Sequence, residues 1–170
     1  MTSPTAPSTA RPSVLRAEAR IDPRLAPWVA FIRAYAAVSR TLEAELEAEQ
    51  ALSLADYDAL VQLTIADGRR LRMSELADRL LLTRSGVSRL VDRLVHDGYV
   101  ERTACATDAR GAFADLTDAG LRRLREATPT HLGGIDAHFL AAIPEEDREA
   151  FVRVLEGIVA AAGGDGGEPG

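Results

Sequence analysis

Apolar residues recur at helical spacing along most of this chain, which predicts a mostly α-helical protein. The clearest stripe occupies positions i, i+3, i+4 and i+7 of one segment: Val87, Leu90, Val91 and Leu94. Thr83 precedes this stripe as the expected N-cap, and Gly98 follows it as the residue expected to end the helix. The stripe therefore predicts a short helix with one buried face.

The opposite face of this helix is polar, and a β-hairpin is expected directly after it. The polar residues are Ser85, Ser88, Arg89, Asp92 and His96, with Arg84 in the first turn and Arg93 at the edge. Two short strands are predicted over residues 99–103 and 112–116, and Arg110 lies in the hairpin tip between them, residues 104–111. This is the layout of a winged helix-turn-helix, whose helix fits the DNA major groove and whose wing reaches the adjacent minor groove.

A long amphipathic helix is expected before this segment, from Pro23 or Pro27 to about Glu49. Its apolar stripe consists of Trp28, Phe31, Ile32, Tyr35, Val38, Leu42 and Leu46. That surface is larger than a small lobe can cover, which predicts a partner subunit; the alternative is a role in the core of one chain only. Residues 144–162 repeat the pattern in a C-terminal helix whose face carries Phe151, Val154, Leu155, Ile158 and Val159.

Three further elements complete the expected lobe. Ser53 caps a second helix, whose predicted buried residues are Leu54, Tyr57, Leu60, Val61 and Ile65. Residues 69–72 are expected to add a short strand beside the wing, and Ser74 is expected to cap the third helix. Thr117 caps the fifth helix, which follows the wing.

Five segments of the chain, in this order and spacing, resemble the MarR family of transcriptional regulators: 73–80, 83–94, 97–102, 108–111 and 116–120. The resemblance covers about residues 25–160. It implies a homodimer formed by the first helix with the last two. It also implies an effector cavity near a set of aromatic residues, with plain core packing as the alternative: Trp28, Phe31, Tyr35 and Tyr57.

The expected fold is thus a winged helix-turn-helix domain with N- and C-terminal dimerisation helices. The predicted division is a disordered tail over 1–20, a dimerisation helix over 21–52, a DNA-binding lobe over 53–117, dimerisation helices over 118–162 and a disordered tail over 163–170.

Charge is distributed unevenly along the 170 residues, whose formal net charge is −6. Residues 69–110 hold nine arginines against six acids, which gives +3 and leaves −9 for the remainder. A locally basic face on an acidic body is typical of a site-specific nucleic-acid binder. No apolar run has the ~18 residues that cross a bilayer, and no signal core precedes the helices, so we expect a cytoplasmic protein without a membrane partner.

The residues expected to contact DNA are Ser74, Thr83, Arg84, Ser85, Ser88, Arg89, Arg93, Asp108 and Arg110. The helix side chains Ser85, Ser88, Arg89 and Arg93 are expected on base edges or flanking phosphates, and Ser74 and Thr83 on phosphates. Arg110 is expected in the minor groove, where A·T segments concentrate negative potential, with Asp108 orienting an arginine.

Other chemistry has weaker support in the sequence. His131 and His138 lie seven residues apart around Asp136, but three groups from one helix seldom complete a metal shell, so ordinary surface or interface histidines are expected. Cys105, the single cysteine, is either a redox switch or an exposed loop residue. No catalytic motif is present, and neither an enzyme nor a cofactor is expected.

The sequence therefore predicts a homodimeric transcriptional regulator, a ligand-responsive repressor of a pseudo-palindromic DNA operator with a small-molecule effector. The alternatives are a winged-helix module that binds protein instead of DNA, and a regulator switched by oxidation of Cys105.

Overall fold

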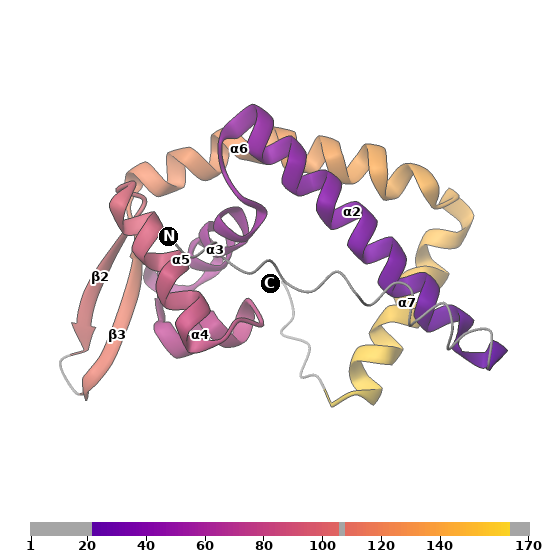
Figure 1. Ribbon diagram of the computed structural model, residues 1–170, viewed down its shortest axis with the longest axis horizontal. Helices are drawn as coiled ribbons and strands as arrows, with labels where there is room; N and C mark the ends of the chain where they lie inside the picture. The colour runs from indigo at the N-terminus through magenta and orange to yellow at the C-terminus, as the bar shows by residue number, and fades with distance from the viewer. Residues whose placement is uncertain (1–21, 106–107, 164–170) are drawn as a thin grey trace, which may run out of the picture.

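A helical lobe with a small β-sheet and a pair of long helices make up the computed structural model, which describes residues 22–105 and 108–163 (Figure 1). The elements are η1 Pro23–Leu25, α2 Ala26–Gln50, α3 Leu54–Ile65, η2 Asp67–Arg69, β1 Arg70–Arg72, α4 Met73–Arg79, α5 Arg84–His96, β2 Val100–Cys105, β3 Asp108–Leu116, α6 Asp118–His138, η3 Leu140–Ala142 and α7 Glu145–Ala161. The mostly helical fold with a β-wing is confirmed. Apart from Gly163, the predicted tails, 1–20 and 163–170, lie outside the described residues.

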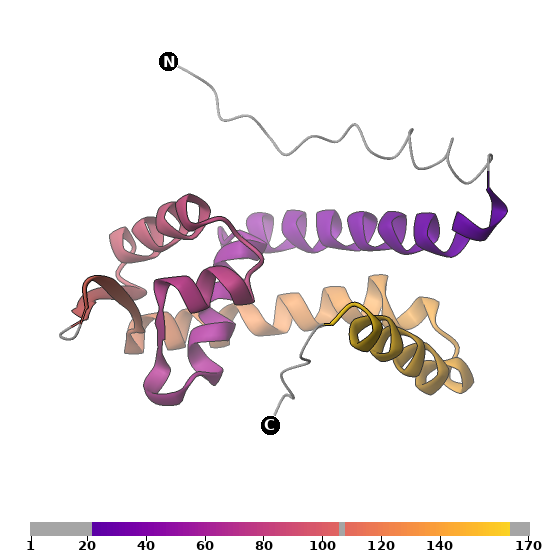
Figure 2. The ribbon, with the colours of Figure 1, turned by 90° about the horizontal axis from the view of Figure 1, so that it is seen from below.

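The long helices α2 and α6 run side by side from the lobe toward the far end of the molecule, where α7 lies (Figures 1 and 2). A glycine permits their close approach, because a Cβ atom on Gly134 would lie 2.6 Å from Cδ2 of Leu42. No helix in the described part of the chain is both long and apolar enough to span a bilayer.

The sheet is antiparallel with the order β1-β3-β2, so the short strand expected near residues 69–72 pairs with the wing as predicted. The predicted hairpin tip was too long. β2 extends to Cys105 and β3 begins at Asp108, because the strands continue to pair beyond an irregularity between Ala104 and Cys105. Arg110 therefore belongs to strand β3 and not to the tip.

The buried apolar residues that the structure describes form one cluster within the lobe, which continues along α6. Its largest fully buried side chains are Leu46, Leu60, Leu63, Leu76, Leu94, Val87, Val91 and Val100. One predicted core residue was wrong: Ile65 is 64% exposed, while Leu63, which was not predicted, is buried. At 100° per residue, Ile65 points away from the side of α3 that Leu60 and Leu63 share.

Three predicted N-caps are confirmed and one is wrong. The hydroxyl oxygens of Ser53, Thr83 and Thr117 accept hydrogen bonds from backbone N–H groups at 3.0–3.1 Å. Ser74, however, lies inside the first turn of α4, because that helix begins at Met73. Its N-cap is Arg72, whose N–H donates to the Glu75 carboxylate at 2.9 Å.

Gly98 ends α5 as predicted. Its φ of +76° lies in the left-handed region, which glycine adopts without steric cost. The N–H of Gly98 donates to the carbonyl of Val95 at 3.0 Å, and that of Tyr99 to the carbonyl of Leu94 at 2.9 Å. This pair of bonds is a Schellman cap, which closes the helix and starts the wing.

Candidate nucleic-acid interface

Helix α5 is fixed in the lobe by its apolar stripe and presents its polar face to solvent. Val87, Leu90, Val91 and Leu94 are all buried, as predicted. On the other side Arg84, Ser85, Arg89, Asp92 and Arg93 are exposed, and Ser88 is partly exposed. The face is therefore accessible along its whole length on a rigidly held helix.

The arginines of this face differ in their partners. Arg93 donates to the Asp56 carboxylate of α3 at 2.7 Å, so its charge is partly compensated. Among the residues that the structure describes, neither Arg84 nor Arg89 has a carboxylate partner. These two guanidinium groups are consequently available to an anionic ligand.

A tight turn between α4 and α5 sets the direction of α5. Leu81 has a φ of +52° and is 93% exposed. Its N–H donates to the Asp78 carbonyl at 3.2 Å, and the N–H of Leu82 donates to the Ala77 carbonyl at 2.9 Å. This is again a Schellman cap, with leucine where glycine is usual.

The wing is attached to α5 by a contact that the sequence analysis missed. Arg102 of β2 pairs with the Asp92 carboxylate at 3.0 Å and donates to the Ser88 carbonyl at 3.4 Å. Helix and wing are thereby held in one orientation. The side chains of Cys105, Asp108 and Arg110 lie outside the described residues, so their expected roles stay predictions.

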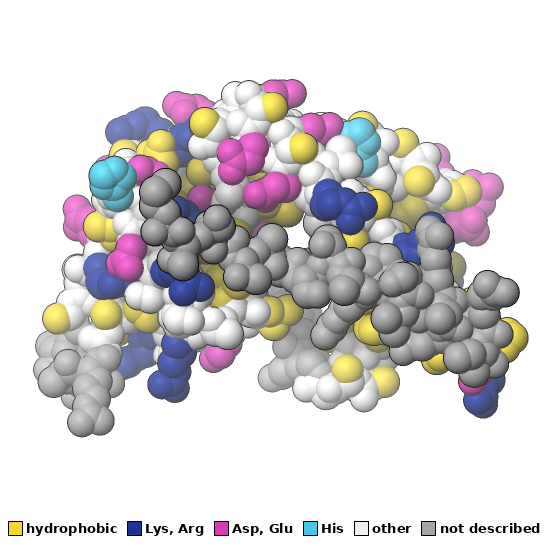
Figure 3. Space-filling view, viewed as in Figure 1, with side chains coloured by type: hydrophobic (Ala, Val, Ile, Leu, Met, Phe, Trp, Pro, Cys, Tyr) yellow, Lys and Arg dark blue, Asp and Glu magenta, His cyan; other side chains and the backbone are white. Residues whose placement is uncertain are grey.

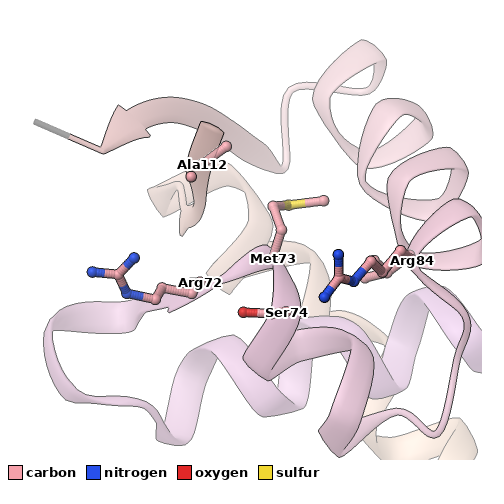
Figure 4. A pocket seen from close by; sticks show the side chains of 7 residues that line it. Arg72, Met73, Ser74, Arg84 and Ala112 are labelled. Carbon is pink, nitrogen blue, oxygen red and sulfur yellow. The ribbon is translucent and has the colours of Figure 1, made fainter. Parts of the chain in front are cut away.

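A cavity of about 310 Å³ separates β3 from the helix-turn-helix (Figure 4). Its lining consists of Arg72, Met73, Ser74, Arg84, Val87, Gly111 and Ala112. In Figure 4 the guanidinium groups of Arg72 and Arg84 lie on either side of the Ser74 hydroxyl. The structure thus brings the predicted residues Ser74 and Arg84 together with Arg72, which was not predicted.

Charged side chains of both signs lie on the face seen in Figure 3. Acidic side chains are spread along its upper side, over α2 and α6, where arginine side chains also occur. Further arginine side chains project from the lower edge of the lobe beside the wing. Positive charges gathered at that edge would attract a polyanion locally.

The structure does not bring the four expected effector residues together. Trp28 and Phe31 stack with 6.2 Å between ring centroids, and Phe31 and Tyr35 line an apolar cavity of about 580 Å³ between α2 and α7. Tyr57 is instead buried in the lobe, where its ring centroid lies 4.3 Å from that of His131. The first helix extends beyond the lobe, which separates its first turns from α3.

The two histidines of α6 have different environments. His138 Nε2 lies 2.6 Å from the Glu45 carboxylate of α2. His131 stacks on Tyr57, its Nδ1 is buried without a hydrogen-bond partner in the described part of the chain, and burial lowers its pKa. Each histidine thus contacts a different element.

Comparison with known proteins points to one family. The sequence model of the MarR family matches residues 52–111. Among curated proteins, the HTH-type transcriptional repressor YetL of Bacillus subtilis is 32% identical over 108 residues, and the regulator MhqR of the same organism is 28% identical over 86. These matches span 64% and 59% of the two relatives, less than two thirds of either.

Solved structures agree over a longer stretch. AbsC, a MarR family transcriptional regulator from Streptomyces coelicolor, is 30% identical with a TM-score of 0.74, covering 85% of this chain and 97% of its own. Sco3205, a MarR family regulator from the same organism in complex with DNA, is 33% identical with a TM-score of 0.72, covering 79% of this chain and 87% of its own.

Proposed function

The chain belongs to the MarR family of transcriptional regulators, and we propose that it represses transcription by binding a pseudo-palindromic operator as a homodimer. One observation carries the proposal: α5 exposes Arg84 and Arg89, which have no carboxylate partner among the described side chains, on a face that the core holds in place. A helix presented in this way fits the major groove, where arginine can donate two hydrogen bonds to guanine.

The proposed contacts follow from position on this face. Ser85, Ser88 and Arg89 read base edges, while Arg93 binds flanking phosphates because Asp56 holds its guanidinium toward α3. The hydroxyl oxygen of Thr83 accepts the Gly86 N–H, so Thr83 positions the first turn of α5 close to the DNA backbone.

The proposal places the two wing residues at the edge of this interface. Arg110 enters the minor groove with Asp108 orienting an arginine, and the extension of β3 to residue 108 supports a wing of sufficient reach.

A second copy of this chain is the proposed cover of α2 and α7. No residue of α7 is buried, although the whole helix is described and carries apolar side chains. The exposed apolar residues of these two helices are Trp28, Phe31, Tyr35, Phe151, Val152, Val154, Ile158 and Val159. A patch of this kind marks an interface, and an apolar homodimer buries roughly 2,000 Å² or more in total.

Control by a small molecule is the remaining part of the proposal. The cavity lined by Phe31 and Tyr35 adjoins the proposed dimer interface, so an apolar ligand there would alter the spacing of the two lobes. Such a ligand shifts the DNA-competent state only by its difference in affinity for the two states.

The test combines oligomeric mass with DNA selection. Light scattering should give twice the chain mass, and Val154→Glu, at a 62% exposed position, should shift the mass toward one chain. A substitution such as Leu42→Glu would not isolate the contact between protomers, because Leu42 is already buried within one protomer. Selection from random duplexes, followed by footprinting, should recover a two-fold symmetric site bound by two chains. A folded dimer that enriches no duplex would favour the protein-binding alternative.

A further inference from the structure

The cavity between β3 of the wing and the helices α4 and α5 is lined by groups that are typical of an anion-binding site. Two guanidinium groups and one hydroxyl line it, together with small or apolar side chains and backbone, and none of the lining residues whose side chains the structure describes is acidic. Guanidinium groups favour phosphate, because their planar set of N–H donors matches its oxygen atoms.

Arg72 is held at this cavity by the sheet. Its Cα is paired with that of Phe113 across β1 and β3, and its guanidinium carbon lies 5.1 Å from the Phe113 ring centroid. Contact with the aromatic face restricts the side chain without neutralising its charge. The Glu75 carboxylate, which is the nearest acid along the chain, accepts the backbone N–H of Arg72.

Arg70 provides an internal comparison. Its guanidinium carbon also lies 5.1 Å from the Phe113 ring centroid, but its side chain pairs with the Asp115 carboxylate. Thr103 donates to the same carboxylate at 2.7 Å. Among the side chains that the structure describes, no carboxylate pairs with Arg72, so within that part of the chain its charge is not compensated as that of Arg70 is.

The cavity also lies where a DNA strand would pass. One wall is β3 of the wing, at Gly111 and Ala112, and the other is the start of the helix-turn-helix, at Ser74 and Arg84. If α5 occupies the major groove and the wing the adjacent minor groove, the sugar–phosphate backbone between the two grooves crosses this space.

We propose that this cavity binds one phosphodiester of the operator backbone in each protomer, with Arg72 and Arg84 supplying the charge and Ser74 a hydroxyl donor. The inference rests on the proposed DNA-binding function and adds Arg72 to its contacts. Because phosphate carries no base identity, the site contributes affinity and register and leaves sequence preference unchanged.

Arg72→Ala and Arg70→Ala form the matched pair for the test. Arg72→Ala should weaken operator and random duplex by the same factor. It should also flatten the plot of log affinity against log salt by about 0.9 per subunit, the value for one lost phosphate neutralisation. Arg70→Ala should change that slope far less, because Asp115 already compensates its charge. Thermal melting checks that both variants fold. Arg72→Gln, which keeps a polar but uncharged side chain, should weaken binding and flatten the salt dependence as Arg72→Ala does.

A second measurement uses the wild-type protein. Replacing operator phosphates one at a time by neutral methylphosphonate should reveal one position per half-site where wild type loses affinity and Arg72→Ala does not. Equal slopes for the two alanine variants, or no position whose effect disappears in Arg72→Ala, would overturn the proposal. DNA-binding function would survive that result, since it requires only that wild type selects an operator.

A soluble phosphate compound would offer this cavity the same anionic group as the DNA backbone. Inorganic phosphate titrated into the DNA-free dimer should bind only weakly, at millimolar concentration or above. Micromolar binding that Arg72→Ala abolishes, without a methylphosphonate-sensitive position, would assign the cavity to a soluble phosphorylated ligand and overturn its assignment to DNA.

Discussion

The guanidinium of Arg123 on α6 donates two hydrogen bonds to Gln50, the last residue of α2, and we call this contact the clasp. It donates to the Gln50 side-chain oxygen at 3.1 Å and also to the Gln50 backbone carbonyl. The Gln50 amide in turn donates to Thr130 at 3.0 Å. The next residue, Ala51, has a φ of +46°, so the chain turns sharply there into the lobe. The clasp therefore fixes the joint between the long helices and the DNA-binding lobe.

Removal of this clasp should destabilise the protein. Arg123 is only 16% exposed, and Arg123→Ala leaves a helix-end carbonyl and an amide without their charged partner. We expect the free energy of unfolding to fall by about 1.5–3 kcal/mol in urea titrations at fixed chain concentration. The neighbouring Arg122, which is exposed, supplies the control: Arg122→Ala should lie within about 0.5 kcal/mol of wild type. Equal stability of the two variants would show that the clasp contributes nothing.

Leu81→Gly should stabilise the protein. A left-handed conformation costs a non-glycine residue about 1–2 kcal/mol, whereas glycine adds about 0.5–1 kcal/mol of chain entropy to lose, so a net gain of roughly 0.5–1 kcal/mol is expected. The side chain of Leu81 is 93% exposed and contributes little packing. Leu82→Gly, whose backbone does not have positive φ, should be destabilising in the same denaturation assay. A loss of stability in Leu81→Gly would contradict the assigned turn geometry.

Substitution by alanine should change the stability of the protein in opposite directions at two glycines of α6. A Cβ on Gly120 would lie 2.2 Å from the backbone oxygen of Tyr99, so Gly120→Ala must displace the wing or the helix and should cost about 1–3 kcal/mol. Gly133 has no atom within 4 Å of its Cβ position, and Gly133→Ala should gain about 0.8–1 kcal/mol from helix propensity. Differential scanning calorimetry of the two variants decides, and a tolerated Gly120→Ala would refute this packing.

His131 should make stability depend on pH below neutrality. Burial lowers its pKa in the folded state beneath the ordinary value of 6.5, so the unfolded chain binds the proton more readily. Its contribution is complete above pH 6.5 and is lost as pH falls through the lowered folded pKa. His131→Phe, which retains an aromatic ring against Tyr57, should reduce the decline in stability as the pH falls below 6.5. His96→Gln, at an exposed position, should leave that decline unchanged; identical pH profiles for all three proteins would exclude His131 as its source.

Much of the lobe was predictable because its determinants are local. The stripe from Val87 to Leu94, the caps at Thr83 and Thr117 and the stop at Gly98 depend on side chains within one or two turns of each other. The predicted cap at Ser74 failed because α4 begins directly after β1, at Met73, so that Arg72 occupies the cap position.

Contacts between distant segments were not predictable from one sequence. Arg123 donates to Gln50 although 73 positions of the chain separate them, and Arg102 of β2 pairs with Asp92 of α5. The same reason explains the misplaced aromatic cluster: helix periodicity puts Tyr57 on a buried face but does not show that His131 covers it. The arginine-lined cavity likewise depends on the packing of four elements, β1, α4, α5 and β3.

Arg89→Ala tests the central claim most directly, because the claim places the exposed face of α5 on base edges. Affinities of wild type and variant are measured on the selected operator and on random duplex at several salt concentrations. A lost arginine–guanine contact removes about 1–3 kcal/mol of discrimination, so the ratio of operator to random affinity should fall by roughly 5- to 150-fold for each half-site. Equal weakening on both duplexes would mean that Arg89 holds only backbone, which would contradict the placement of α5 in the groove.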